Sequence, residues 1–108
     1  MTPALNYQDL DLQRAVADEL PGLTVLQFGT NWCGHCQAAQ AVVDPVMAQF
    51  PHVARHMVED GPGRPLGRSY RIKLWPTLVF LQDGKEVDRL VRPQEQAPVQ
   101  EILARLSL

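Results

Sequence analysis

Trp32-Cys33-Gly34-His35-Cys36 is the stretch of sequence that decides the fold and the chemistry of this chain. It contains the only two cysteines among 108 residues, and it follows an apolar run, Leu23 to Phe28, where a helix is expected to begin. Residues i and i+3 in a first helical turn lie roughly 5 to 6 Å apart, within the range of about 4.4 to 6.8 Å between Cα atoms that a disulfide needs. The pair can therefore form and break a disulfide with little movement of the backbone.

The two cysteines are expected to have different roles. Cys33 would lie at the helix N-terminus, where unpaired backbone N–H groups and the positive end of the helix dipole favour a thiolate. We therefore predict that Cys33 is the nucleophile and that Cys36, one turn further into the helix, is the resolving thiol.

Two other interpretations of the pair remain open from spacing alone. The cysteines could be a buried structural pair, or they could supply half of a metal or cluster site shared by two chains. A structural zinc site usually needs four ligands, and His35, His52 and His56 have no zinc-finger spacing to a second cysteine pair. Redox chemistry is therefore the preferred interpretation, with no metal site expected.

The motif resembles the active site of the thioredoxin superfamily, in which a Trp also precedes the first cysteine, as Trp32 does here. Downstream, Trp75-Pro76-Thr77, the apolar run Leu78 to Leu81, and Asp83-Gly84-Lys85 resemble the cis-proline strand and hairpin of that family. The resemblance covers most of the chain. It implies a thioredoxin-like fold, a redox-active disulfide, protein-disulfide reductase activity and a part in cell redox homeostasis.

Two departures from thioredoxin itself concern the residues expected to tune the acidity of the thiols. Gly34-His35 replaces the Gly-Pro of thioredoxin and resembles the dipeptide of protein disulfide isomerase. Gln27 stands six residues before the first cysteine, where thioredoxin keeps a buried aspartate. An amide cannot accept a proton at neutral pH, so the attack by Cys36 is expected to be slow.

Three further residues are expected to bind substrate. Trp32 would shield the nucleophile and contact the partner, although it could also belong to the core. Pro76 is expected to follow a cis peptide bond, leaving the backbone of Trp75 free to pair with an extended substrate segment. The Trp75 side chain would either narrow that groove or cap a hydrophobic edge.

The rest of the chain predicts alternating helices and strands in one domain, residues 1–108. The expected elements are a short edge strand at Ala4 to Tyr7, a helix from Asp9 to Leu20, a buried strand at Leu23 to Phe28, a helix from the motif to about Phe50, a strand at Val53 to Glu59, a short helix at Leu66 to Arg71, a hairpin of Thr77 to Gln82 and Lys85 to Val91, and a helix from near Ala97. The fold class is α/β, a central mixed sheet of four to five strands with helices on both faces.

Composition limits the range of partners and locations. Ten Lys and Arg against twelve Asp and Glu give a formal charge of −2 without a basic stripe, so no nucleic-acid partner is expected. No run of 18 apolar residues and no signal sequence is present, and two cysteines in catalytic spacing suit a reducing compartment. We expect a cytoplasmic monomer that binds no membrane.

The leading functional hypothesis is a thiol–disulfide oxidoreductase that reduces or exchanges disulfides in protein substrates through Cys33 and Cys36. No bound cofactor is expected. By resemblance, the external reductant would be NADPH through a thioredoxin reductase, or glutathione. The alternatives are a redox-switched protein-binding module of the same fold that does not turn over, and a disulfide oxidase or isomerase.

Overall fold

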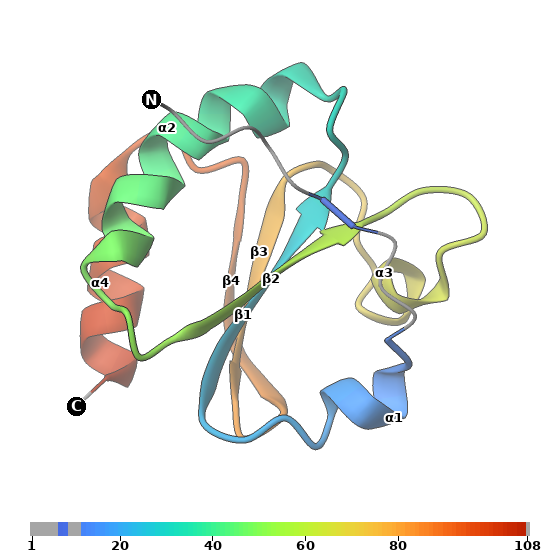
Figure 1. Ribbon diagram of the computed structural model, residues 1–108, viewed down its shortest axis with the longest axis horizontal. Helices are drawn as coiled ribbons and strands as arrows, with labels where there is room; N and C mark the ends of the chain where they lie inside the picture. Colours follow the sequence, from blue (N-terminus) through green and yellow to red (C-terminus); the bar gives the residue numbers. More distant parts are fainter. Residues whose placement is uncertain (1–6, 9–11, 108) are drawn as a thin grey trace.

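The computed structural model describes residues 7–8 and 12–107, which form one four-stranded sheet with helices on both sides (Figure 1). The elements in chain order are α1 (Arg14–Ala17), β1 (Leu23–Gly29), α2 (Gly34–Ala48), β2 (Ala54–Glu59), α3 (Pro65–Ser69), β3 (Thr77–Gln82), β4 (Lys85–Val91) and α4 (Gln96–Leu106). The sheet order is β2-β1-β3-β4. The predicted α/β fold with a mixed sheet is confirmed, with four strands among the described residues.

The central position of β1 follows from its sequence. All its residues except Leu23 are buried, as expected for a short strand of apolar and β-branched residues covered on both faces. It pairs in parallel with β2 and antiparallel with β3, and β3 pairs antiparallel with β4. The strand therefore ends inside the molecule, and the active-site motif follows directly.

Alternate residues of β1 enter two separate hydrophobic cores. Val25 belongs to the core under α2 and α4, whereas Leu26 and Phe28 belong to the core on the opposite face, which Ala17 of α1 and Leu66 of α3 also enter. Figure 1 shows the same division, with α2 and α4 on one side of the sheet and α1 and α3 on the other. The prediction of helices on both faces is thus confirmed.

The Asp83-Gly84 turn forms as its sequence predicts. Both residues have positive φ angles, 52° and 82°, as a two-residue type I′ hairpin requires, and such turns favour Asp followed by Gly. The Asp83 carboxylate also accepts a hydrogen bond from the Gly22 N–H at 2.8 Å. The hairpin is thereby joined to the turn that precedes β1.

The first helix is shorter than predicted. α1 contains only four residues, so the helix predicted from Asp9 to Leu20 is wrong at residues 12–13 and 18–20, which are not helical; residues 9–11 lie outside the described part. Leu12 and Leu20 pack on the core from non-helical backbone that flanks the helix. Their spacing matches helical periodicity although neither residue lies in a helix.

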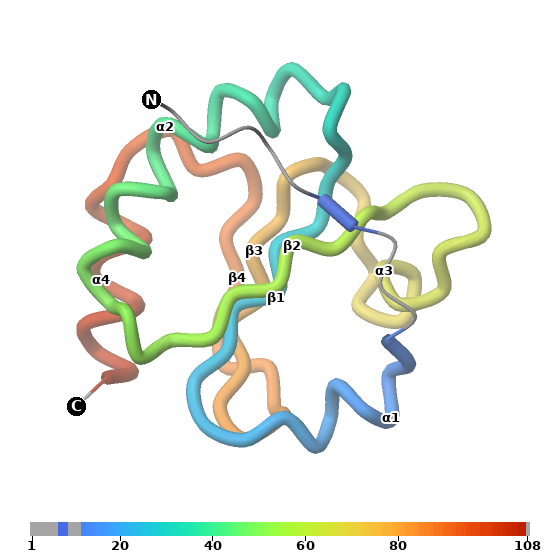
Figure 2. Tube along the Cα trace, viewed as in Figure 1, coloured from blue at the N-terminus to red at the C-terminus, as the bar shows by residue number. Residues whose placement is uncertain are grey.

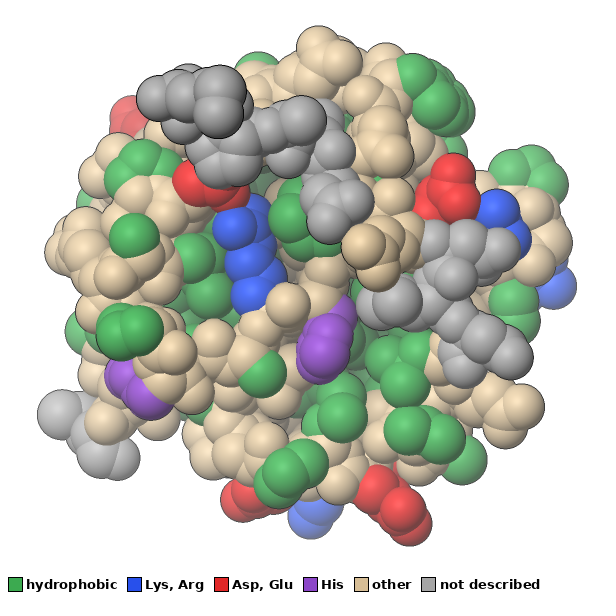
Figure 3. Space-filling view, viewed as in Figure 1, with side chains coloured by type: hydrophobic (Ala, Val, Ile, Leu, Met, Phe, Trp, Pro, Cys, Tyr) green, Lys and Arg blue, Asp and Glu red, His purple; other side chains and the backbone are tan. Residues whose placement is uncertain are grey.

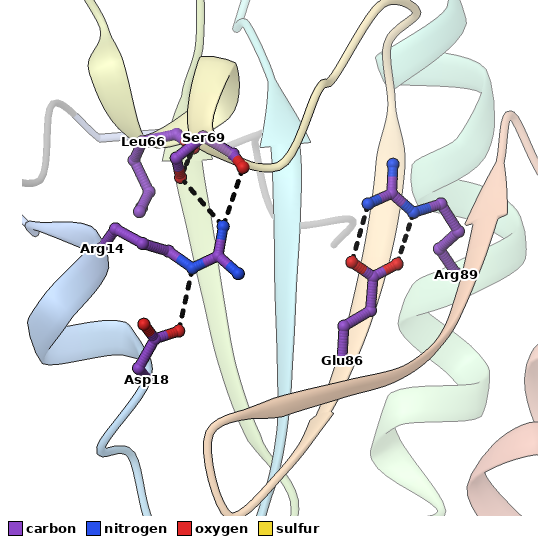
Figure 4. A network of polar contacts seen from close by, with 6 residues as sticks. All are labelled: Arg14, Asp18, Leu66, Ser69, Glu86 and Arg89. Atoms are coloured by element: carbon purple, nitrogen blue, oxygen red, sulfur yellow. Dashed lines mark hydrogen bonds and ion pairs between the residues drawn. The ribbon is translucent and has the colours of Figure 1, made fainter.

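Arg14 ties this short helix to α3, as Figure 4 shows. Its guanidinium donates to Asp18 Oδ1 at 2.9 Å and to the Ser69 carbonyl at 2.8 Å, and it lies 3.8 Å from the ring centroid of Tyr70. Figure 4 also shows Arg89 and Glu86 paired side by side through two hydrogen bonds on β4. These contacts lie on the face of the sheet away from α2.

The chain at residues 7 and 8 runs beside β2 (Figure 2). Gln8 forms an isolated parallel bridge with Val58, and its N–H donates to the Met57 carbonyl at 3.1 Å. Residues 4–6 of the predicted edge strand lie outside the described residues. β3 and β4 have their predicted bounds, and the remaining elements differ from prediction by one or two residues at an end. α3, for example, ends at Ser69, and Arg71 adopts a φ of 58°, outside the right-handed helical region.

Candidate active site

Cys33 and Cys36 lie at the junction between β1 and α2. Cys33 is the N-cap of α2, and its Sγ accepts the Cys36 backbone N–H at 3.2 Å. Both residues are free thiols; Cys33 is 7% exposed, whereas Cys36 is fully buried. The predicted placement of Cys33 at a helix N-terminus is confirmed, and of the two cysteines only Cys33 retains any exposure.

Burial dominates the acidity of Cys36. Desolvation, with a smaller contribution from hydrogen bonding to Cys33, raises the pKa of the Cys36 thiol to about 12. Hydrogen bonds from the Thr30 backbone and from the Tyr7 hydroxyl act in the opposite direction. Burial therefore favours the neutral thiol of Cys36, and the Thr30 backbone and the Tyr7 hydroxyl partly offset that effect on its pKa.

Behind Cys36, a hydrogen-bonded chain joins the side chains of Tyr7, Gln27, Arg55 and Asp44, in that order. Gln27 is its second member. Its Nε2 donates to the Tyr7 hydroxyl at 2.7 Å, and its Oε1 accepts from Arg55 Nη2 at 2.8 Å and from Arg55 Nε at 3.2 Å. Arg55 Nη1 in turn donates to Asp44 Oδ1 of α2 at 2.7 Å. Gln27 is fully buried, and its amide is satisfied on both sides.

Two tryptophans flank the motif. Trp32 is 73% exposed, so the interpretation of Trp32 as a core residue is wrong. Its ring meets Trp75 edge to face, with 5.7 Å between ring centroids. The Trp75 indole N–H donates to Asp60 Oδ2 at 2.8 Å, and the side chain packs against the cluster of Tyr7, Cys33 and Cys36. Trp75 is thus held in place beside the cysteines.

The peptide bond between Trp75 and Pro76 is cis, as predicted, and Pro76 is buried. The backbone of Trp75 is not wholly free, however, because its carbonyl accepts a hydrogen bond from Arg92 Nε at 2.8 Å. Arg92 follows β4 and is itself anchored by its N–H to the Pro76 carbonyl at 2.8 Å. The pairing of the Trp75 backbone with a substrate segment stays a prediction, and one acceptor position of its carbonyl is already used.

His35 is exposed in the first turn of α2, with Gly34 before it. It borders a hollow of about 260 Å³ between α2 and the segment after β4, where Arg92 and Pro93 also lie. The other histidines are elsewhere; His52, for example, contacts Ser107 beyond the end of α4. Within residues 7–8 and 12–107, no cluster of three or more His, Cys, Asp or Glu side chains could hold a metal ion.

Sequence reasoning missed several residues of this site. Asp60 and Arg92 bond Trp75, Tyr7 packs with the cysteines, and Asn31 and Asp44 hold Tyr7 and Arg55 behind them. Their only signal in the sequence was indirect, namely that a buried Gln27 must have partners. Arg55 contacts Gln27 because β2 pairs with β1, and the sequence did not indicate that contact.

A mixed sheet, a Cys-x-x-Cys pair at a helix N-terminus and a cis-proline beside it define a thiol–disulfide oxidoreductase. A family model described as Thioredoxin matches residues 4–105, and the chain belongs to the thioredoxin family. As a thioredoxin it reduces and exchanges protein disulfides through its Cys-x-x-Cys pair, and thioredoxins need no bound cofactor.

Individual relatives agree with this assignment. The structure of thioredoxin 2 from Pseudomonas aeruginosa PAO1 in its reduced form is 49% identical over 94% of each chain, with a TM-score of 0.85. A thioredoxin of Chlamydia trachomatis is 37% identical over 81 residues, which are 73% of this chain and 78% of that one. A thioredoxin H-type of Fagopyrum esculentum is 33% identical over 69 residues, 64% of this chain and 60% of that protein.

Proposed function

We propose that the chain acts as a single-domain protein-disulfide reductase in which Cys33 attacks and Cys36 resolves. The Cys33 thiolate attacks one sulfur of a substrate disulfide and releases the other as a thiol, leaving a mixed disulfide. Cys36 then attacks Cys33, so that the substrate leaves reduced and the protein carries the Cys33–Cys36 disulfide. The observation that carries this assignment is the position of Cys33 as the N-cap of α2, together with the complete burial of Cys36 one turn inside it.

The substrates we infer are disulfide-bonded proteins that offer an extended segment beside the cysteines. Trp32 supplies an exposed aromatic surface, and Leu74 and Val91 are exposed hydrophobic residues on either side of the Trp75-Pro76 turn. Substrate would pair with the remaining acceptor capacity of the Trp75 carbonyl. On the face that Figure 3 shows, acidic and basic side chains are interspersed, which does not favour a nucleic-acid partner.

The reductant and the location are part of the same proposal. A dithiol that turns over must be reduced again, by NADPH through a thioredoxin reductase or by glutathione, and both suit a monomer in the cytoplasm. Among the helices of the described residues, none has both the length and the apolar character needed to cross a membrane.

Turnover separates the reductase from a binding module. With dithiothreitol as electron donor, we expect the protein to reduce the disulfides of a protein substrate catalytically, with many substrate molecules reduced per protein molecule. The variant with both cysteines changed to serine is the control and should add nothing to the rate of dithiothreitol alone. Stoichiometric binding without turnover would favour a redox-switched binding module instead.

His35 is expected to make the disulfide more oxidising than that of thioredoxin. A positive charge on His35, two residues from Cys33, would stabilise the Cys33 thiolate, and stabilising the thiolate stabilises the reduced form. We therefore expect a potential displaced from thioredoxin's value of about −270 mV toward the roughly −180 mV of protein disulfide isomerase. His35→Pro should make the potential more negative by about 30 mV, a tenfold change in the equilibrium constant.

Equilibration with glutathione redox buffers measures that potential. His52→Ala is the matched control, since His52 contacts Ser107 far from the motif and should leave the potential unchanged. A shift of less than about 10 mV in His35→Pro, well below the roughly 30 mV of a tenfold change, would show that the imidazole is solvated and without influence.

A further inference from the structure

Gly29, the last residue of β1, leaves a space in which Tyr7 and Cys36 meet. A Cβ at this position would lie 2.6 Å from Cys36 Sγ and 2.9 Å from the Tyr7 hydroxyl oxygen. Both side chains are buried, and both converge on the same small volume. Tyr7 and Cys36 also pack in one cluster with Cys33, so the Tyr7 hydroxyl lies near the resolving sulfur on its buried side.

The directions of the hydrogen bonds in the chain behind Cys36 are fixed by Arg55. A guanidinium only donates, so the Gln27 atom that contacts it must be the carbonyl oxygen. The other end of the amide is then the NH₂ group, which donates to the Tyr7 oxygen. Because that oxygen is already an acceptor, the phenolic hydrogen of Tyr7 is free to point at Cys36.

We propose that Tyr7 is a catalytic residue of the resolving step, whose hydroxyl donates a hydrogen bond to the Cys36 thiolate, with Gln27 and Arg55 as its positioning residues. This assignment rests on the dithiol exchange proposed above. It differs from a carboxylate base at position 27, because the chain runs from the Arg55–Asp44 ion pair through the Gln27 amide, and neither the guanidinium nor the amide accepts a proton. The Tyr7 hydroxyl at its end would stabilise negative charge on sulfur by donating a hydrogen bond.

The balance of the step is simple. Cys36 loses its proton, its sulfur forms a bond to Cys33 Sγ, and the bond between Cys33 and the substrate sulfur breaks. The substrate thiolate leaves with the electron pair and takes up one proton from water, so the thiol proton of Cys36 is accounted for on the released substrate thiol. Tyr7 keeps its own proton throughout, and burial, followed by the proximity of Cys36, raises the pKa of its phenol above the ordinary value.

Asn31 fixes the Tyr7 backbone from the loop before the motif. Its Oδ1 accepts the Tyr7 N–H at 2.9 Å, and its Nδ2 donates to the Tyr7 carbonyl at 3.2 Å. Two hydrogen bonds from one amide hold the residue in a single orientation. The titratable and charged groups that face Cys36 and Tyr7 are Cys33 on α2, Arg55 on β2 and, beyond Arg55, Asp44 on α2.

The inference can be tested by following the two halves of exchange with one equivalent of 5,5′-dithiobis(2-nitrobenzoate). Attack by Cys33 releases the first nitrothiobenzoate, and attack by Cys36 releases the second. In Tyr7→Phe we expect the first release to change by less than twofold and the second to slow about tenfold. At pH values below the pKa of Cys36, the pH profile of the second release should also move upward. Tyr7→Phe should need a pH about one unit higher than the unmodified protein to release at the same rate.

Two further variants separate this role from a structural one. Tyr70→Phe is the matched control, because the Tyr70 hydroxyl is buried in the opposite core with no hydrogen-bond partner among the described residues. It should leave both releases unchanged. Gln27→Glu keeps the length of the side chain but makes both of its oxygens acceptors, so the Tyr7 hydroxyl turns toward position 27 and the second release should slow as well.

An unchanged second release in Tyr7→Phe would overturn the inference, and so would a faster second release in Gln27→Glu, which is the result expected of a carboxylate base. In either case a normal first release would leave the proposed function standing. If the unmodified protein gave no first release, the proposed function would fail, and this inference with it.

Discussion

Cys36→Ser is expected to accumulate mixed disulfides with its substrates, whereas Cys33→Ser is expected to accumulate none. Cys33 is the more exposed of the two cysteines, and its sulfur accepts a backbone N–H at the start of α2, so we expect it to attack a substrate disulfide without help from Cys36. The complex then persists in Cys36→Ser, because a serine hydroxyl cannot release it. Non-reducing gel electrophoresis after incubation with a disulfide-bonded protein, followed by mass spectrometry of the bands, measures both outcomes.

The variant with both cysteines changed to serine controls for adhesion to unfolded substrate. Turnover with dithiothreitol should be lost in both single variants, since each lacks one of the two steps. Equal trapping by Cys33→Ser would reverse the roles assigned to the two sulfurs. That result would also require the chain around Cys36 to open, because this residue is fully buried.

The strands of the sheet could be predicted from the sequence almost to the residue. β3 and β4 agree with prediction at both ends, because a short run of apolar residues, an Asp-Gly turn and a second strand have few other solutions. β1 was bounded by Pro21-Gly22 in the same way. The long helix was predicted from its start, since the cysteine spacing itself indicated where it begins.

The first helix could not be predicted in the same manner. Leu12 and Leu20 are as apolar as residues on a helix face, but they contact the core from the segments on either side of α1. Tertiary contacts hold α1 in place. Arg14 donates a hydrogen bond to α3, and its guanidinium packs against the Tyr70 ring. Periodicity over a dozen residues carries no information about such contacts.

The motif residues were predictable, but the polar chain behind them was not. Cys33 and Cys36 are three residues apart, so helix geometry alone placed them together. Tyr7 and Gln27, in contrast, are 20 residues apart, and Arg55 is a further 28 residues along the chain. They meet because β2 pairs in parallel with β1 and because residues 7–8 run beside β2. Only the topology of the sheet brings these groups behind Cys36.

The same topology explains why Arg92 was missed. Hairpin pairing carries β4 back beside the start of β3, so the residue that follows β4 lies next to Pro76. Its guanidinium then reaches the Trp75 carbonyl. The Trp75 backbone, predicted to be free to pair with substrate, therefore already accepts one hydrogen bond from within the molecule. Fewer acceptor positions remain for a substrate.

Gly29→Ala is expected to lower the stability of the reduced protein and to slow the resolving step together. The new Cβ would lie 2.6 Å from Cys36 Sγ and 2.8 Å from Tyr7 Cζ, closer than real Cβ contacts allow. Neither neighbour has free space, because both are buried, so the start of α2 or the segment at residue 7 must shift. Such overpacking costs about 1 to 3 kcal/mol, and each 1 kcal/mol lowers Tm by roughly 4–8 °C in a domain of this size.

Gly34→Ala provides the matched control at the other glycine of the site. Nothing lies within 4 Å of a Cβ at Gly34, which occupies the first turn of α2, so alanine there should be neutral or stabilise by up to about 1 kcal/mol. Chemical unfolding of the reduced variants measures the free-energy difference, and the second nitrothiobenzoate release measures resolution. If Gly29→Ala were as stable as Gly34→Ala and resolved at the normal rate, Tyr7 would not meet Cys36 over Gly29. The contact on which the role of Tyr7 depends would then be absent.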